Sequence, residues 1–372
     1  MRRMRRREPG RERLLCGARG SRRLLPGVQA LLTIRRIDLR ATIAHRPLKL
    51  IRFGEGSPSR GTSAVEPGWP HSRPARHTGL CTSREDAMAL RIPTLRQRRL
   101  GAELRRMREQ TGFGGSHLAR LLGVTPALVT QMENGKSAVN EDRLREIAEA
   151  CLCTNTPLIE ALADMTRERE TGWWEEYSRS LTTDLLDVAA IEAHARRIST
   201  YSITFLPGLL QTPAYAASVF ARAIPPLPQP DVDLRLAFRL RRQQIVRNGD
   251  TPYTAYVHEA ALRMQFSGPK ALAEQLGALI DHSESPGISV RVVPFKIESL
   301  PGPSENFVYI AGPVPELDTV QIDISFGCPL FDTPSDLESY REILDRMAAV
   351  ALSEDDSRDF IGSIKKEIEG DE

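Results

Sequence analysis

The sequence predicts an all-α domain of five helices, followed by a mixed α/β domain and preceded by a disordered N-terminal extension. Residues 1–87 are rich in Arg, Gly and Pro, and offer too little apolar surface to offset the entropy of ordering them. Residues 92–165 combine an apolar helical repeat with closely spaced helix caps and glycine stops. Residues 170–372 mix short strands with amphipathic helices, the pattern of a sheet covered by helices.

Composition separates these three regions by charge. The 372 residues are 41% hydrophobic and 27% charged, enough for two or three domains with cores of their own. The formal charge of +3 conceals 20 Lys and Arg against 7 Asp and Glu in 1–87, 11 against 7 in 88–150, and 20 against 34 in 151–372. The longest apolar run is far shorter than the ~18 residues of a membrane-spanning helix. A basic extension, a mildly basic small domain and an acidic body are expected to have separate roles.

The extension 1–87 admits four interpretations. Clustered arginines could form an arm that contacts phosphates, and an organellar transit peptide is also rich in Arg and poor in acids. An export signal needs an apolar core, and the nearest one, 24–34, contains Pro26 and Gly27 and runs into Arg35 without a small-residue cleavage site. We favour the fourth, a start codon assigned too far upstream of Met88, because 45 Arg against 6 Lys indicates a GC-rich coding sequence.

The cysteines predict neither a disulfide framework nor a metal site. Cys16 and Cys81 lie in the extension and Cys328 stands alone. A single residue separates Cys151 from Cys153, whereas zinc knuckles and redox motifs use two. An odd number of unpaired thiols is typical of a reducing compartment, so we expect a cytoplasmic protein. If it binds DNA, it should be associated with the nucleoid. We also expect that it needs no cofactor.

The all-α region begins with a helix from Leu95 that carries Leu100, Leu104 and Met107 at helical spacing and stops at Gly112. Ser116 is expected to cap a short second helix that ends at Gly123. Thr125 is expected to cap the third helix, with Pro126 in its first turn, Asn134 at its end and Gly135 as its terminator. Asn140 caps the fourth helix, whose first turn contains Glu141 and Asp142.

Two short helices joined by a turn that contains glycine form a helix-turn-helix. Ala119 is small where the two helices must cross, and the buried side is supplied by Leu118, Leu122, Val124, Val129 and Met132. The opposite stripe of the helix capped by Thr125 carries Ala127, Thr130, Gln131 and Asn134 at positions i, i+3, i+4 and i+7. The alternative is a plain helical hairpin with solvated polar faces, which the agreement of caps, turn and spacing disfavours.

That stripe suits a helix placed in the major groove of DNA. Gln131 has the amide that pairs bidentately with adenine, and Thr130 or Ala127 can touch a thymine methyl group. Ser116, Asn134 and Lys136 lie near helix ends, where phosphate contacts usually orient a protein on the duplex. The helix from Thr125 to Asn134 is therefore the predicted DNA-reading element.

Residues 95–153 resemble the five-helix DNA-binding domain of the phage-repressor or XRE class. The family pattern LAxxLGVSxxxVSxxExG is met by LARLLGVTPALVTQMENG at 118–135. The resemblance implies that 125–134 is the recognition helix and that operator DNA is bound by a dimer. Many members carry a backbone-contacting Gln at the start of the preceding helix, whereas this chain has Gly114 and Gly115. That phosphate contact is then absent or made by the main chain.

The acidic body is predicted to start with a linking helix at 158–169 and then to alternate strands and helices. Strands are expected at 201–206, 253–257, 288–295, 306–311 and 319–324. Helices are expected after the Thr212 cap and at 231–247, 270–282, 335–352 and from Ser353 onward, with Ser335 and Glu338 as a capping box.

Chemistry-bearing patterns are scarce in this region, so we expect no enzyme. His258 and Glu259 begin like a metalloprotease helix, but the second His is missing, which leaves a strand-end histidine as the better interpretation. PGLLQT at 207–212 is either a ligand loop or, as we favour, a tight strand-to-helix turn. Trp173 and Trp174 suit a partner-binding anchor or packing between the two domains equally well.

The region also resembles the C-terminal domain of actinobacterial WhiJ-like or antitoxin-like regulators. FLPGLLQTPAY, RLRRQ at 239–243, HEAALR, EQL with SVRVVPF, and ALSEDDSRDFI carry this resemblance, which with the DNA-binding domain covers 88–372. The resemblance implies a regulator often encoded beside a small partner protein, with a C-terminal domain whose ligand or partner is poorly defined. Members commonly have Gly-Ala-His after the VVPF strand, where this chain has Lys296-Ile297-Glu298 and Ser299.

Together these observations predict a sequence-specific DNA-binding regulator, dimeric on double-stranded operator DNA, whose acidic body senses a ligand, mediates dimerisation or docks a small partner. The alternative is an antitoxin-like protein that mainly neutralises a small partner and binds DNA for autoregulation. An enzyme with a DNA-binding appendage is the least favoured class, because no nucleophile, metal or phosphate constellation stands out.

Overall fold

The computed structural model describes residues 93–167, 172–298, 302, 305–324 and 327–370, all within the compact unit Cys81–Glu372. The expected disordered extension 1–87 and the alternative start Met88 lie outside the described residues. No described helix has both the length and the apolarity needed to cross a membrane.

Five helices form the predicted all-α domain. They are α1 (Leu95–Gln110), α2 (Gly115–Leu121), α3 (Pro126–Glu133), α4 (Glu141–Ala150) and α5 (Thr156–Arg167). The capping predictions for α3 and α4 are confirmed, because the Thr125 hydroxyl accepts from the Leu128 N–H and the Asn140 side chain accepts from the Arg143 N–H. The expected linking helix starts two residues earlier than predicted, since α5 begins at Thr156.

One apolar core unites these helices. Leu104, Leu118, Val129, Leu144 and Leu162 are each 1% exposed or less. Burying a side chain of this size stabilises a fold by about 1.5–3 kcal/mol relative to leaving it exposed. The periodicity expected from the sequence therefore identifies the true core of this domain.

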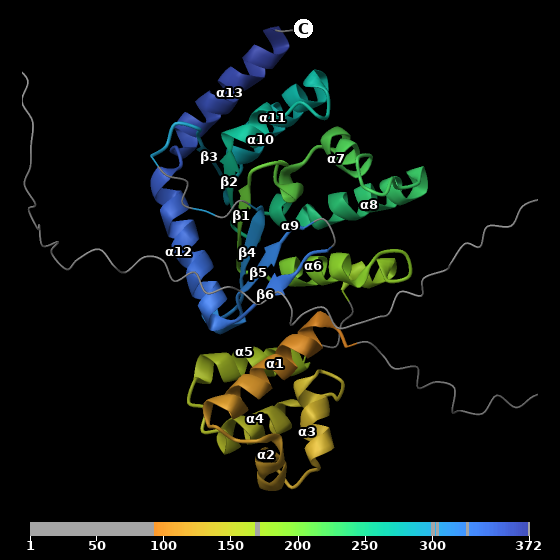
Figure 1. Cartoon of the computed structure of the whole chain (residues 1–372), viewed down its shortest axis with the longest axis vertical. Coiled ribbons are helices and arrows are strands. Elements are labelled where there is room, and N and C mark those ends of the chain that lie inside the picture. Colours follow the sequence, from red (N-terminus) through yellow and green to blue (C-terminus); the bar gives the residue numbers. More distant parts are fainter. Residues whose placement is uncertain (1–92, 168–171, 299–301, 303–304, 325–326, 371–372) are drawn as a thin grey trace, which may run out of the picture. The chain divides into compact units, whose positions relative to one another are not determined.

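The α/β domain contains one sheet of six strands in the order β3-β2-β1-β4-β5-β6 (Figure 1). The strands are β1 (Arg197–Ser202), β2 (Tyr253–His258), β3 (Ile288–Val293), β4 (Phe307–Ala311), β5 (Thr319–Ile322) and β6 (Leu330–Phe331). β1, β2 and β3 run parallel, whereas β4, β5 and β6 continue the sheet antiparallel from β1. The predicted mixed α/β class is confirmed.

Helices cover both faces of this sheet. The longer ones are α6 (Thr183–Ala193), α7 (Pro213–Phe220), α8 (Gln229–Arg242), α11 (Pro269–Ser283), α12 (Pro334–Val350) and α13 (Glu354–Gly370). The shorter ones are η1 (Trp173–Tyr177), η2 (Gly208–Leu210), α9 (Gln244–Arg247), α10 (Glu259–Arg263) and η3 (Pro315–Leu317). Apolar residues of α7, α11 and α13 pack on one face, and those of α12 pack on the other.

The first strand differs from its prediction at 201–206, because it spans Arg197–Ser202. This strand is central and buried on both faces, yet it carries Ser199, Thr200 and Ser202. Thr200 is tolerated there because its hydroxyl accepts from the Tyr253 hydroxyl at 2.9 Å. A strand that buries polar residues on both faces lacks the apolar alternation that sequence analysis relies on.

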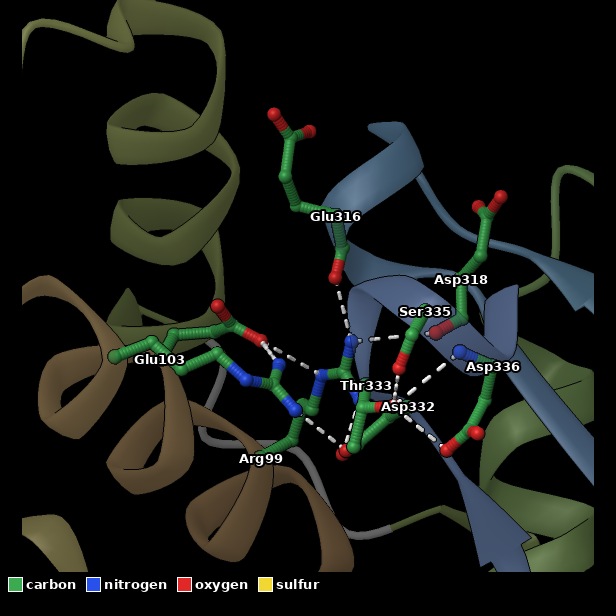
Figure 2. Close-up of polar contacts among 9 residues, drawn as sticks. Arg99, Glu103, Glu316, Asp318, Asp332, Thr333, Ser335 and Asp336 are labelled. Atoms are coloured by element: carbon green, nitrogen blue, oxygen red, sulfur yellow. Dashed lines mark hydrogen bonds and ion pairs between the residues drawn. The ribbon is translucent and has the colours of Figure 1, made fainter. Parts of the chain in front are cut away.

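Other differences concern helix starts and short elements. The capping box of Ser335 and Glu338 was a wrong prediction, because Thr333 caps α12 by accepting from the Asp336 N–H at 3.3 Å (Figure 2). Pro334 then occupies the first helical position, where the lack of an N–H costs nothing. Sequence analysis did not assign α6, α10 or β6.

The PGLLQT segment is a tight turn held by three buried glutamines. The Gln211 side chain donates to the Leu206 carbonyl at 2.8 Å, Gln243 donates to the Gln211 carbonyl at 2.8 Å, and Gln275 donates to the Leu210 carbonyl at 2.9 Å. The Arg239 guanidinium donates to the Gln211 side-chain oxygen at 2.7 Å, and burial lowers the pKa of Arg239 to about 10. Buried carbonyls require such partners, so the turn interpretation accounts for these residues.

Candidate DNA-binding surface

The two helices of the motif meet at their small and apolar side chains. Leu118 and Ala119 of α2 and Val129 and Met132 of α3 are each at most 3% exposed, and Leu122 and Val124 pack partly buried against the same core. Gly123 has φ +63°, a left-handed conformation that glycine adopts without steric cost, which allows the chain to turn from α2 into α3. The predicted buried side and the predicted turn are both confirmed.

A contact with α1 supports the end of α3. A Cβ on Gly101 of α1 would lie 2.6 Å from the carbonyl oxygens of both Met132 and Glu133, so only glycine lets the two backbones approach this closely. This role of Gly101 is not predictable from the sequence, because an isolated glycine in a helical pattern carries no sign of what lies opposite it.

An ion pair fastens the same end of α3. The Arg108 guanidinium contacts the Glu133 carboxylate through two hydrogen bonds, Nε to Oε1 at 2.6 Å and Nη2 to Oε2 at 2.9 Å, and its third nitrogen donates to the Phe113 carbonyl at 2.7 Å. Hydrogen bonding to Glu133 raises the pKa of Arg108 above its ordinary value. Both side chains are only 11–12% exposed, so this bidentate pair holds α3 in a fixed orientation on α1.

The opposite stripe of α3 faces away from the core. Ala127, Thr130, Gln131 and Asn134 are all exposed. The Thr130 hydroxyl donates to the Pro126 carbonyl at 3.1 Å, whereas the Gln131 amide group makes no hydrogen bond to any described residue. Asn134 is the C-cap of α3 and precedes Gly135, which has φ +69°. The stripe thus presents two methyl groups, one hydroxyl and two amides on a rigidly held helix.

The predicted phosphate contacts Asn134, Lys136 and Ser116 occupy three different places, and Asn134 is exposed at the C-cap of α3. The predicted DNA-binding residue Thr125 is also exposed, but its hydroxyl is already used in the cap of α3. Lys136 is exposed just beyond the end of α3 and has no ion-pair partner among the described residues. Ser116 is exposed, but it lies inside the first turn of α2 and caps nothing, because the helix begins two residues earlier than expected. The N-cap is Gly114, which offers no side-chain hydrogen bond.

Five arginines of α1 have carboxylate partners, so they are not free for phosphate. Arg98 pairs with Asp187, Arg99 with Asp332, Arg105 with Glu109, Arg106 with Glu103, and Arg108 with Glu133. Arg120 on α2 is different, because it is exposed and forms no ion pair within the described part of the chain. Sequence analysis did not select Arg120, although its place in the family pattern next to the buried Ala119 predicts an outward side chain.

The remaining candidates of the α/β domain have structural explanations. The His258 side chain stands at the end of β2, and its Nδ1 accepts from the Ala260 N–H at 3.2 Å, which makes it the N-cap of α10. Trp173 packs against Phe238 of α8, with ring centroids 5.3 Å apart, so its contacts lie within the α/β domain. Among the described residues, no group of three His, Cys, Asp or Glu side chains is placed to hold a metal ion.

Two family models match separate parts of the chain. Residues 99–162 match the model of a helix-turn-helix domain, and residues 185–363 match that of a domain of unknown function, DUF5753. No curated protein and no solved structure matches the chain significantly. The helix-turn-helix match supports a DNA-binding regulator.

Proposed function

We propose that this chain, with a helix-turn-helix domain joined to an α/β domain of unknown function, is a sequence-specific transcriptional regulator of the XRE type. The observation that carries the proposal is the exposed stripe Ala127, Thr130, Gln131 and Asn134, on a helix whose other side is buried and fastened to α1. A rigid helix with short polar side chains fits the major groove of B-DNA, whereas a mobile one would lose affinity to ordering entropy.

Roles follow from the chemistry of each side chain. Gln131 reads a base edge, because its unengaged amide can both donate to and accept from adenine. Thr130 and Ala127 supply methyl groups for contact with thymine. Lys136 and Arg120 flank the stripe with positive charges for phosphate oxygens, and neither has an ion-pair partner among the described residues. Ser116, Thr125 and Asn134 contribute polar groups near helix ends.

A dimer on a two-fold symmetric operator is part of the proposal. One recognition helix reads only a few base pairs, and two half-sites one helical turn apart provide the specificity that a single helix lacks. The proposed setting is the cytoplasm, with no catalytic activity, and the proposed relatives are the WhiJ-like or antitoxin-like regulators of actinobacteria. The α/β domain then senses a ligand or docks a small partner encoded nearby.

Fluorescence anisotropy tests the proposal with the full chain. DNA flanking its own gene is titrated against scrambled DNA at about 0.15 M salt, and we expect a preference of about 10³-fold or more. Gln131→Ala should weaken operator binding by about 5- to 150-fold, corresponding to 1–3 kcal/mol, and leave the affinity for scrambled DNA unchanged. Gln244→Ala, at an exposed position of α9, serves as the matched control. An equal loss of affinity for operator and scrambled DNA would show that Gln131 does not contact a base edge.

The second candidate is an antitoxin-like protein that neutralises a small partner. One observation favours it: Phe205, Met264 and Phe295 are 38–56% exposed, and each follows the carboxyl end of one of the parallel strands β1, β2 and β3. The carboxyl ends of parallel strands meet at one edge of a sheet, where binding sites commonly form. Exposed aromatic and Met side chains are the residues that anchor protein partners.

Co-expression with the product of the neighbouring gene separates the two candidates. A partner-neutralising protein should co-purify with that product, and Phe295→Ser should abolish the complex while leaving DNA binding intact. A chain that binds its operator selectively and forms no such complex is a regulator of the first kind.

A further inference from the structure

Three arginines of α1 join the DNA-binding domain to the α/β domain, and one of them, Arg106, pairs with the Asp332 carboxylate at 2.5 Å. The Arg99 guanidinium donates to the Glu316 carbonyl at 2.5 Å and to the Asp318 carbonyl at 3.2 Å, and also pairs with the Asp332 carboxylate (Figure 2). Arg98 pairs with Asp187 of α6. Because the partners are separated by more than eighty positions in the chain, these contacts fix how α1 lies against the sheet end and α6.

Between the Arg98–Asp187 pair and the Arg99–Asp332 pair lies a cavity of about 870 Å³. Its walls come from α1 and α5 on one side, and from α6 and the β4–β6 end of the sheet on the other. Pockets for small molecules typically measure about 300–1,000 Å³ and often form where two domains meet. The cavity therefore has the size and the position of a ligand site.

The lining determines which ligand class fits. Apolar side chains come from both sides and include Leu95, Ala102, Met165, Ile191, Ile310 and Ile324. Four arginines are balanced by four aspartates, and the two bridging pairs already neutralise Arg98 and Arg99. A charged ligand would have to break one of these pairs or leave its own charge without a partner, which is costly in a partly buried site.

We propose that this cavity binds an uncharged, predominantly apolar small molecule. Ile324 is 53% exposed although it belongs to the lining, so a ligand would cover apolar surface that is now open to water. The regulatory consequence rests on the proposed function. Since α1 forms one wall and also backs α3 through Gly101, a bound ligand acts on the helix that supports the DNA-reading stripe.

N-phenyl-1-naphthylamine, an uncharged fluorescent probe, tests the site in the full chain without DNA. We expect one saturable site, and at least tenfold weaker binding in Ala311→Trp and in Ala102→Trp, which fill the cavity from opposite walls. Ala217→Trp, at a similarly half-buried position of α7 outside the lining, should bind the probe like the wild type. Each variant is first checked for the wild-type far-ultraviolet circular dichroism spectrum, and two independent fillings keep the test valid if one fails to fold.

Unchanged probe affinity in both filled variants would overturn the proposal and place the probe elsewhere, for example on Phe205 and Phe295. Tighter binding of an anionic naphthalene sulfonate than of the neutral probe would overturn the ligand class. Saturating probe should then shift operator affinity about 5- to 150-fold in the wild type and not in the filled variants. Probe binding does not require DNA, so a failure of the cavity and a failure of the proposed DNA recognition give different results.

Discussion

Gly101→Ala tests whether the close approach of α1 and α3 supports the DNA-binding domain. Helix propensity alone predicts that alanine stabilises an interior helical position by about 1 kcal/mol over glycine. The added Cβ would instead lie 2.6 Å from two carbonyl oxygens, those of Met132 and Glu133, and backbone atoms cannot rotate away as a side chain can. Overpacking of this kind costs about 1–3 kcal/mol, and two simultaneous contacts place it near the upper end. The net expectation is a loss of about 1–2 kcal/mol, after the gain in propensity.

Amide hydrogen exchange in the full chain measures this loss, because it reports the opening of the DNA-binding domain separately from the α/β domain. Peptides covering α1 and α3 should lose protection by about 5- to 30-fold in Gly101→Ala. Gly115→Ala is the matched control, since a Cβ there meets nothing within 4 Å, and it should keep its protection. Protection in Gly101→Ala equal to or above that of the control would refute the reasoning, because it would show that α1 and α3 can move apart to accommodate the added Cβ without loss of stability.

Two further predictions concern phosphate contacts and pH. Lys136→Ala should weaken binding to operator and scrambled DNA alike, and should reduce the slope of log Kd against log salt concentration by about 0.9. Lys270→Ala, at an exposed position of α11, is the control and should leave this slope unchanged. An unaltered slope in Lys136→Ala would mean that Lys136 touches no phosphate. Burial lowers the pKa of His258 below its usual 6.5, and its Nδ1 can cap α10 only as the neutral ring. The stability from this cap is present above about pH 6.5 and lost as the pH falls through the lowered pKa. The protection factor of the Ala260 amide, which is the factor by which its exchange is slower than that of an unstructured peptide at the same pH, should therefore fall in acid in the wild type but not in His258→Asn. Identical pH profiles of protection in the two proteins would exclude the cap as the cause.

The DNA-binding domain could be predicted from sequence because its signals are local. Thr125 and Asn140 cap helices through atoms three residues away, and Gly123 turns the chain where its own φ requires it. The exposed stripe of α3 follows from the 3.6-residue period alone. The prediction of Ser116 as the cap was wrong because α2 starts two residues earlier, at Gly115, and glycines carry no side chain that would mark a cap in the sequence.

The α/β domain was predicted less well, because its residues depend on distant partners. β1 buries Thr200 and other polar side chains in the middle of the sheet, so its pattern resembles that of no ordinary strand. Gln211, Gln243 and Gln275 read as surface residues in the sequence, yet each satisfies a buried carbonyl of one turn. No spacing within the chain predicts such pairings, since they join helices and loops brought together by folding.

By itself, the sequence determined the fold class, a helix-turn-helix region followed by a mixed α/β region, and the exposed polar stripe of α3, because hydrophobic period, caps and turn residues act within a few positions. Only the tertiary structure decided that Gly101 and Arg108 fasten that helix, that most arginines of α1 are already paired, and that a cavity lies between the pairs of Arg98 and Arg99. The physical reason is distance along the chain. Close packing and ion pairing depend on which side chains the completed fold places within a few ångströms of one another, and segments far apart in sequence meet only there.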